Sequence, residues 1–246
     1  MTTERDPRLE VTAVRARYDD LTFFGTVDAW HLFTAKEIQK EIASVWPTLP
    51  TGSGRVILNA GAGGNDLGLV QPATINLDIS PTRISSMPNP IVASVEALPL
   101  SDGSVDTLLC VGSVINYCDA AAAIAEFGRV LRPGGALILE FESSFSAELV
   151  TQQAFGRTAA VAETFYANQK EAVWVYAPSH VRRLLNAADL RVTRSVPIHV
   201  LSPWALLLLR SARIATPIAR LDRLVRNVQP LRRWASNHLF FCEKET

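Results

Sequence analysis

The fold is decided by the stretch RVILNAGAGGND, residues 55–66, in which a short aliphatic run ends in closely spaced glycines and then an acidic residue. A strand that is apolar on both faces is typical of a buried parallel sheet. The glycines that follow, Gly61, Gly63 and Gly64, uncover the backbone N–H groups and permit positive φ, because no Cβ stands in the way. Since open α/β sheets bind ligands at the carboxyl ends of their strands, the stretch predicts a first strand and a ligand-binding loop.

Further aliphatic segments repeat this pattern and predict the rest of an α/β, doubly wound, mostly parallel seven-stranded sheet. The expected strands are TINLDI (74–79), PIVAS (90–94), VDTLLCV (105–111), ALILEFE (136–142), LRVTRSVPIHV (190–200) and HLFFCEK (238–244), with a further strand-like EAVWVY (171–176). A helix is expected over 119–131, because Asp119 is a suitable N-cap and RPGG follows as a stop signal. Another is expected over 179–188.

The remaining segments predict how a single domain, 1–246, is organised. We expect a helical cap at 1–50, a cofactor-binding core at 51–142, a substrate-side segment that completes the sheet at 143–202, a helical insertion at 203–236 and a last strand at 237–246. Helical spacing of apolar residues at 8–18 and 28–46 predicts the cap helices. Residues 143–168 are expected to be mostly helical.

The overall composition excludes several classes of protein. The 24 basic and 24 acidic residues cancel, so no nucleic-acid partner is expected. Three cysteines without a CxxC or Cys/His cluster indicate a reducing compartment and no metal site. The charged N-terminus lacks the apolar region of a secretion signal, and the run WALLLL is too short to span a bilayer. We expect a cytoplasmic protein.

Asp78 identifies the kind of ligand. It ends the second predicted strand seventeen residues after Gly61, where a carboxylate can accept hydrogen bonds from a ribose diol. The dinucleotide fingerprint GxGxxG would need a glycine where this chain has Asp66. Asp66 and Asn59 are poor neighbours for a pyrophosphate, whereas a zwitterionic sulfonium ligand tolerates them. The residues therefore favour S-adenosylmethionine over a nicotinamide dinucleotide.

Four motifs in order resemble those of class I S-adenosylmethionine-dependent methyltransferases, specifically the type 11 small-molecule group. They are VILNAGAGG, INLDIS, ASVEALPLSDGSVDTLLCVGSVINYCD and AIAEFGRVLRPGGALILEF, which fall within about residues 55–142. The resemblance implies a Rossmann-like fold with an antiparallel last strand. It also implies S-adenosyl-L-methionine as the cofactor and methyl transfer to a small molecule as the activity.

Carried over by position, the resemblance implies a set of cofactor-binding residues. The set is Asn59, Ala60, Gly61, Gly63, Asp78, Ile79, Ser94, Val95, Val111 and Gly112. Gly61 and Gly63 would face the methionine portion, whose tail the strand-end residues Val111 and Gly112 would border. Asp78 would bind the ribose hydroxyls. Ile79, Ser94 and Val95 would surround the adenine.

Three positions depart from the family pattern. Asn59 replaces an acidic residue, Asn65 replaces the third glycine, and Ser94 replaces an aspartate that accepts from the adenine amino group. Losing a charged partner costs on the order of 1 kcal/mol more than losing a neutral one. These departures keep open a protein that binds S-adenosylmethionine without turnover. A nicotinamide-dependent oxidoreductase is a further alternative.

Methyl transfer from a sulfonium needs little chemistry from the protein, so no catalytic triad is expected. A general base helps when the acceptor is a hydroxyl, and oxygen is the acceptor atom that we expect, with nitrogen and carbon as alternatives. The candidate catalytic residues are Tyr117 and His31. Tyr18, Ser113 and Asn116 are the candidate substrate-binding residues, since they lie in the cap or follow the fourth strand.

The insertion at 203–236 holds seven arginines and one aspartate. Ser202-Pro203 and Thr216-Pro217 are expected to start two helices, and Pro230 to end the second. Ile218, Leu221, Val225 and Val228 would form its apolar face. That face predicts a lid over the substrate pocket with its arginines in solvent. Alternatives are a helix resting on anionic lipid, flanked by Trp204 and Trp234, and arginines that grip an acidic substrate.

Overall fold

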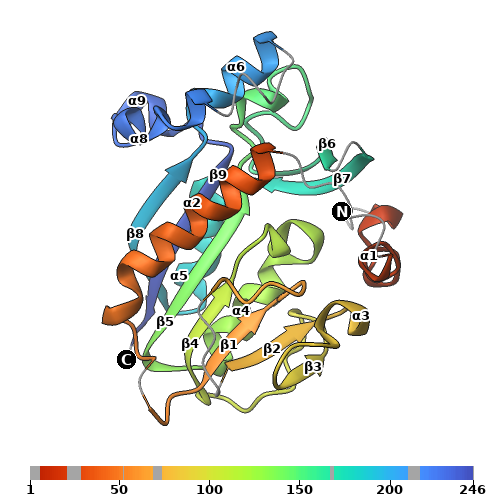
Figure 1. Ribbon diagram of the computed structural model, residues 1–246, viewed down its shortest axis with the longest axis vertical. Helices are drawn as coiled ribbons and strands as arrows, with labels where there is room; N and C mark the ends of the chain where they lie inside the picture. Colours follow the sequence, from red (N-terminus) through yellow and green to blue (C-terminus); the bar gives the residue numbers. More distant parts are fainter. Residues whose placement is uncertain are drawn as a thin grey trace.

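The computed structural model describes residues 6–20, 29–51, 53–68, 74–166, 169–209 and 217–245. Its centre is a seven-stranded sheet in the order β3-β2-β1-β4-β5-β9-β8 (Figure 1). The strands are β1 (Ile57–Ala60), β2 (Thr74–Asp78), β3 (Pro90–Val92), β4 (Val105–Cys110), β5 (Leu131–Glu142), β8 (Leu190–Ile198) and β9 (Asn237–Lys244). Strands β1 to β5 pair in parallel, and β9 is antiparallel to both β5 and β8. The expected doubly wound sheet with a reversed last strand is confirmed.

The aliphatic runs of the sequence become the buried centre of this sheet. Every residue of β1 and β4 is buried, and the two strands lie side by side in register. Both faces of the sheet need an apolar cover, because a parallel strand of this composition cannot face water. That requirement explains why helices lie on both sides.

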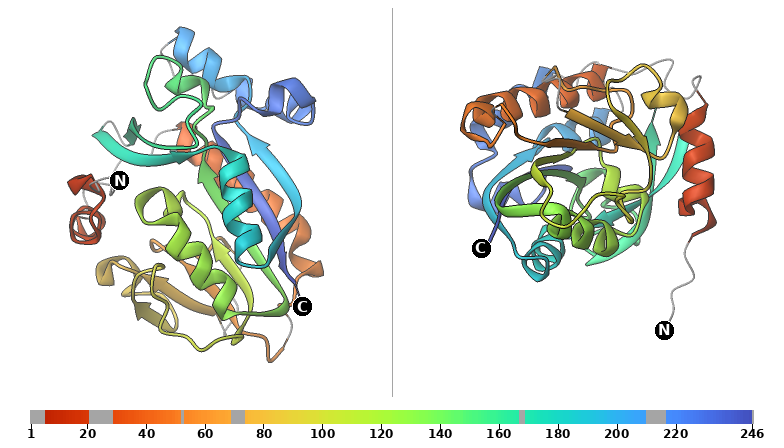
Figure 2. Two further views of the ribbon diagram at one scale, coloured as in Figure 1. Left: turned by 180° about the vertical axis from the view of Figure 1, so that it is seen from behind. Right: turned by 90° about the horizontal axis from the view of Figure 1, so that it is seen from below.

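Three helices cover the two faces. Helices α4 (Ala120–Val130) and α5 (Pro178–Ala187) pack on one face, and α2 (Ala29–Val45) packs across the other, as the opposite views in Figure 1 and Figure 2 show. The Asp119 side chain accepts hydrogen bonds from the backbone N–H groups of Ala121 and Ala122, so the expected N-cap of α4 is confirmed.

Short elements lie around the two ends of the sheet. Helix α1 (Val11–Asp19) lies beside α3 (Pro81–Ile84), to which Asp19 is joined by a hydrogen bond of 2.6 Å from the Ser80 hydroxyl. The 3₁₀ turns are η1 (Pro7–Leu9), η3 (Trp46–Thr48), η4 (Val114–Tyr117) and η5 (Ala147–Leu149). Helix α1 therefore continues the α2 side of the cap around the outer edge of the sheet.

The segment 143–168 is not mostly helical, so that prediction was wrong. The described part holds only the short turn η5 and then strand β6 (Ala159–Tyr166), which pairs with β7 (Gln169–Tyr176) in a separate two-stranded antiparallel sheet. The alanines and glutamates of this stretch favour a helix locally. Pairing with β7 along eight residues and the burial of Ala162 against Val173 outweigh that preference.

The described parts of the insertion, 203–209 and 217–236, contain short helices. They are α6 (Ser202–Leu209), α8 (Asp222–Val225) and α9 (Gln229–Arg232). Pro230 lies in the first turn of α9, so it begins a helix and does not end one. The expected N-cap at Thr216 falls outside the described residues.

The arginines of the insertion are not all in solvent, contrary to expectation. Arg223 and Arg226 form ion pairs with Glu37 and Glu41 on α2, and the Arg226–Glu41 distance is 2.8 Å. Glu41 also pairs with Arg194 of β8. The two glutamate side chains are nearly buried, because these arginines cover them. The ion pairs therefore fix the insertion to α2.

The expected apolar face of the second helix is not buried either. Leu221 and Val228 are exposed, as are Leu208 and Leu224, while Ile218 and Val225 are half-buried. None of these side chains lines the cavity that opens at the strand ends. The described helices include none that is both long and apolar enough to cross a membrane.

Candidate active site

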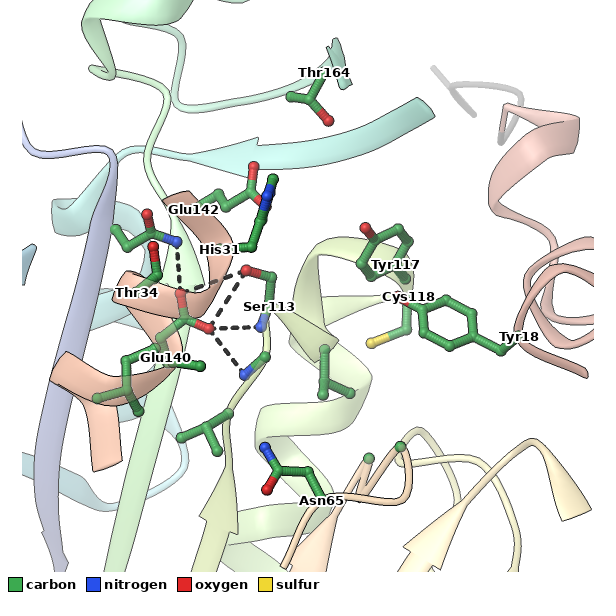
Figure 3. A pocket seen from close by; sticks show the side chains of 18 of the residues that line it. Tyr18, His31, Thr34, Asn65, Ser113, Tyr117, Cys118, Glu140, Glu142 and Thr164 are labelled. Carbon is green, nitrogen blue, oxygen red and sulfur yellow. Dashed lines mark hydrogen bonds between the residues drawn. The ribbon is translucent and has the colours of Figure 1, made fainter. Parts of the chain in front are cut away.

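A cavity of about 520 Å³ opens at the carboxyl ends of β1, β2, β4 and β5 (Figure 3). It lies where the strand order reverses, since β1 has β2 on one side and β4 on the other. That crevice is the usual ligand site of an open α/β sheet. Helices α1 and α2, η5 and β6 enclose the far side of the cavity.

The glycines of the loop after β1 have the positive φ expected of them, but two of their N–H groups are not free for a ligand. Gly61 and Gly63 have φ of 72° and 57°, and a Cβ on Gly61 would collide with the Val114 side chain. The N–H of Gly61 donates to the Leu77 carbonyl at 2.8 Å, and the N–H of Gly63 donates to Asp78 Oδ2 at 2.8 Å. These two amides are therefore already bonded within the protein, and the glycines serve close approach of the backbone.

Asp78 links the loop to the second strand. Its Oδ1 accepts from the Ser80 N–H at 2.8 Å, while Oδ2 accepts from Gly63. Burial raises the pKa of this carboxyl, and the hydrogen bonds from Ser80 and Gly63 oppose that rise. Each carboxylate oxygen has a second lone pair, so Asp78 can still accept two hydrogen bonds from the cavity that it lines.

Two residues of the expected cofactor set lie behind the loop. Asn59 is buried, and its Nδ2 donates to the Asn65 carbonyl at 2.9 Å and to Asn76 Oδ1 at 3.1 Å. Ala60 is fully buried, and neither Asn59 nor Ala60 lines the cavity. The expectation of direct cofactor contact needs correction for both, because Asn59 supports the loop from beneath. Asn65, in contrast, lines the cavity.

The other expected cofactor residues gather on one side of the cavity. Ile79, Ser94 and Val95 line it next to Asp78, and Val111 and Gly112 line it at the end of β4. The Ser94 hydroxyl accepts a hydrogen bond from the Glu96 N–H at 3.1 Å. The apolar surface of Ile79 and Val95 suits a flat aromatic ring.

Glu140 shapes the end of β4, and the sequence motifs did not reveal it. Its Oε2 accepts from the N–H groups of Gly112 and Ser113 at 3.0 and 2.5 Å, and its Oε1 accepts from Asn237 Nδ2 at 2.7 Å (Figure 3). Burial raises the pKa of Glu140, and these hydrogen bonds oppose the rise. Ser113 has φ of 58°, a conformation that costs a non-glycine residue free energy and that Glu140 holds in place.

The acceptor side contains the expected aromatic residues. Tyr18 and Tyr117 both line the cavity and contact each other edge to face, with ring centroids 5.6 Å apart. The Tyr117 hydroxyl donates to Glu171 Oε2 at 2.8 Å. Burial, together with the charges around it, raises the pKa of Tyr117 well above its usual value. Tyr117 therefore keeps its proton and cannot act as a base at neutral pH. His31 lines the same side from α2.

Asn116 is not a substrate-binding residue in this structure. It is fully buried and does not line the cavity. Its Oδ1 accepts from the Glu142 N–H at 3.0 Å, and its Nδ2 donates to the Trp174 carbonyl. Asn116 thus joins β5 to β7, a role that its position after the fourth strand could not reveal.

Two further carboxyl groups reach the acceptor side, Glu142 at the end of β5 and Glu148 in η5. Burial and the neighbouring carboxylates Glu140 and Glu148 raise the pKa of Glu142 to about 8. Burial also raises the pKa of Glu148, whose Oε1 accepts from the Ser236 hydroxyl at 3.2 Å. Among the described residues that line the cavity there is no lysine or arginine.

This arrangement fits S-adenosylmethionine. A buried carboxylate with unused acceptor sites is available for the ribose, and Ile79 and Val95 offer an apolar surface for the adenine. The absence of cationic side chains from the described lining suits a ligand with a positive charge and does not suit a pyrophosphate. It also gives the described arginines of 203–236 no role in gripping an acidic substrate, since none of them lines this cavity.

The fold and the cavity define an α/β protein that binds its ligand at the strand ends. Comparison with known proteins shows which α/β proteins this chain is similar to. Residues 51–139 match the family model of the methyltransferase domain. The ubiquinone/menaquinone biosynthesis C-methyltransferase of Rubrivivax gelatinosus is 32% identical over 146 residues, which cover 57% of this chain and 58% of that protein. The malonyl-[acyl-carrier protein] O-methyltransferase of Dechloromonas aromatica is 37% identical over 68 residues, or 26% of each chain.

Solved structures agree in fold. The geranyl diphosphate C-methyltransferase of Streptomyces coelicolor aligns with a TM-score of 0.60 at 12% identity, covering 98% of this chain and 100% of that chain. The 1,6-didemethyltoxoflavin-N1-methyltransferase of Burkholderia thailandensis, with bound S-adenosylhomocysteine, aligns with a TM-score of 0.56 at 13% identity, covering 97% and 88%.

Residues 51–139 therefore match a methyltransferase domain, and the resemblance to class I S-adenosylmethionine-dependent methyltransferases that the motifs indicated is confirmed for these residues. The enzyme class and the cofactor expected from the sequence are those of this family. The chain spans less than two thirds of the length of the first curated relatives that it matches.

Proposed function

We propose that this chain transfers the methyl group of S-adenosylmethionine to a hydroxyl oxygen of a small molecule. The observation that carries the proposal is the single cavity of about 520 Å³ that joins Asp78 and the glycine loop to a chamber lined by Tyr117, His31 and Glu142. A donor bound at the first end and an acceptor bound in the second would share one enclosed space. Holding the two reactants together supplies most of the rate acceleration that such a displacement needs.

Oxygen as the acceptor atom is supported by the titratable groups of the chamber. Proteins similar to this chain are named for methylation at carbon, nitrogen and oxygen, so similarity does not select the atom. A hydroxyl must lose its proton as it attacks, and a nearby base assists that loss. The chamber contains the carboxyl groups of Glu142 and Glu148 for this purpose. The pyrophosphate of a nicotinamide cofactor lacks a cationic partner among the described lining residues.

The proposed roles of the side chains follow from their places in the cavity. Asp78 accepts the ribose hydroxyls, and the backbone around Gly61 gives the methionine portion room. Tyr117 keeps its proton and orients the acceptor through its hydroxyl. His31 and Tyr18 close the chamber from the cap and exclude water.

Calorimetric titration with S-adenosylmethionine, S-adenosylhomocysteine and NAD, followed by transfer of a labelled methyl group to a panel of hydroxyl, amine and carbon acceptors, tests the proposal. We expect both sulfur ligands to bind, NAD not to bind, and label to appear on a hydroxyl compound. Binding of NAD alone would remove the proposal. Tight S-adenosylhomocysteine binding with no methylation of any acceptor would support a binding protein without turnover.

Two broader expectations are also proposals. A cytoplasmic location agrees with the absence of a membrane-spanning helix from the described residues.

Peripheral contact with anionic lipid through the insertion is supported by the exposed side chains of Leu208, Leu221, Leu224 and Val228. Such contact would bring the cap close to apolar acceptors.

A further inference from the structure

Glu142 occupies the border between the two halves of the cavity. It is the last residue of β5, and its side chain lines the cavity together with Ser113, which follows the end of β4. Its neighbour on the same face of the strand, Glu140, is fully engaged with the backbone of Gly112 and Ser113. Figure 3 shows Glu142 directed into the cavity beside His31, on the far side of Ser113 from Asn65 and the glycine loop.

The surroundings of Glu142 are strongly acidic. Glu140 on the same strand, Glu148 in η5, Glu171 on β7 and the Tyr117 hydroxyl in η4 all face it from the elements packed around the chamber. Two nitrogen groups oppose these carboxyls: His31 of α2 interacts electrostatically with Glu148 and Glu171, and Arg17 of α1 forms an ion pair with Glu171 at 3.9 Å. A buried carboxyl group that is surrounded by other carboxyl groups stays protonated until a positive charge approaches.

We propose that Glu142 accepts the proton of the methyl acceptor, and that it becomes ionised only when the positively charged methyl donor enters the cavity. This inference rests on the proposed function and names the base that the proposed function requires. The donor carries its charge on sulfur, and the spent donor, S-adenosylhomocysteine, carries none there. Glu142 would therefore be a base in the presence of the donor and a neutral acid after the reaction.

The charges balance through the transfer. As the acceptor oxygen forms its bond to the methyl carbon, Glu142 takes the hydroxyl proton. The carbon–sulfur bond breaks, and its electron pair stays on sulfur. One sulfonium cation and one carboxylate anion are thereby converted into two neutral groups, so the buried chamber ends the step with less charge than it had before.

The same surroundings narrow the acceptor class. The carboxyl groups of Glu140, Glu142 and Glu148 that line the cavity disfavour acceptors that carry a phosphate or a carboxylate. We therefore assign the acceptor to uncharged hydroxyl compounds.

A binding experiment tests this without knowledge of the acceptor. Dissociation constants of S-adenosylmethionine and S-adenosylhomocysteine are measured by calorimetry between pH 5.5 and 9, and their ratio is followed. Because an ionised Glu142 interacts with the sulfonium and not with the thioether, the donor should gain affinity over the spent donor as pH rises toward about 8, by up to about tenfold per pH unit. At higher pH the ratio should become constant.

Glu142→Gln should abolish this rise. The titrations of the ligands themselves occur equally with the wild type and the variant, so the difference between the two proteins isolates Glu142. Glu171→Gln is the matched control, because Glu171 is a buried glutamate near the chamber that does not line the cavity. The Glu171→Gln variant should still show the rise of the affinity ratio with pH. The rise should occur at lower pH, because the Glu171 carboxylate no longer repels the charge on Glu142.

The outcomes separate this inference from the proposed function. If neither sulfur ligand binds, the proposed function is wrong. If both bind with a ratio that is independent of pH, or if Glu142→Gln keeps the rise, the inference is wrong and the proposed function stands. If the variant does not fold, the wild type still decides: at pH 7, titration in two buffers of different ionisation enthalpy should show one proton released with the donor and none with S-adenosylhomocysteine.

Discussion

At the scale of single residues, Asp78 is the side chain on which cofactor binding most depends. Its carboxylate joins the glycine loop to β2 and still offers acceptor sites to the cavity. We expect Asp78→Ala to weaken S-adenosylmethionine binding by about 1–3 kcal/mol, the cost of a lost charged hydrogen bond. Asp66→Ala is the control, because Asp66 lies in the same loop outside the cavity lining and should leave affinity unchanged. An unchanged affinity for Asp78→Ala in calorimetry would refute the ribose assignment.

The cofactor half of the site could be predicted from the sequence because it depends on short local motifs. A strand followed by glycines, and a strand that ends in Asp78, place their residues at one sheet edge whatever the rest of the chain does. Glu140 was missed because its role depends on contacts with the end of β4 and with β9. A signal was nevertheless present: two acidic residues spaced by two at the end of an aliphatic strand share one face, which in this fold points toward the cleft.

At the scale of secondary-structure elements, Asp222 determines where the insertion begins. Its buried carboxylate accepts from the N–H groups of Val200 and Leu201 and from the Ser202 hydroxyl, at the start of α6. Removing it would take away the acceptor of the Val200, Leu201 and Ser202 N–H groups, while the Ser202 hydroxyl would keep its hydrogen bond with His199. We expect Asp222→Ala to lower the free energy of unfolding by about 1–3 kcal/mol. Chemical denaturation measures this.

Asp222→Asn is the matched comparison for that prediction. The amide keeps the size of the side chain and one acceptor oxygen, so its loss of stability should fall between that of the alanine variant and none. Equal stability of all three proteins would show that water replaces the carboxylate, and that the insertion is held only by the ion pairs of Arg223 and Arg226 with α2.

The elements that the sequence predicted well are those whose local signals agree with the fold. The strands of the sheet have continuous aliphatic runs, and Asp119 starts α4 as a capping residue should. Segment 143–168 has no such agreement, because its alanines and glutamates favour a helix and its partner strand β7 comes later in the chain. Pro230 was misplaced because a proline can follow one helix or start the next.

At the scale of the whole molecule, the insertion at 203–236 is joined to the chamber through α2. Ala219 and Ala205 pack with Trp30 and Phe33 of α2, and the ion pairs with Glu37 and Glu41 lie further along the same helix. Helix α2 in turn lines the cavity. A force applied to the insertion, such as contact with a surface, would therefore reach the acceptor chamber through one helix.

The exposed side chains of the insertion predict that the surface it contacts is an anionic lipid membrane. Leu208 and Leu224 are 76% and 78% exposed, a large fraction for leucine in a folded protein, and Arg220 and Arg233 are exposed in the same segment. Apolar side chains beside arginine favour anionic lipid, although Trp204 and Trp234 pack against each other inside the insertion and add no aromatic anchor. We expect cosedimentation with vesicles that contain anionic lipid at low salt, and weaker binding to zwitterionic vesicles.

The double variant Leu208→Ser and Leu224→Ser isolates the apolar part of this interaction. Both side chains are exposed, so the replacements should change the free energy of unfolding by less than about 0.5 kcal/mol each. Burying one leucine side chain in the membrane would contribute about 1.5–3 kcal/mol of binding free energy. Loss of both leucines should therefore lower the affinity for vesicles at least about tenfold. If the wild type does not cosediment with anionic vesicles even at low salt, the exposed leucines do not serve a lipid surface, and the acceptor must reach the chamber from solution.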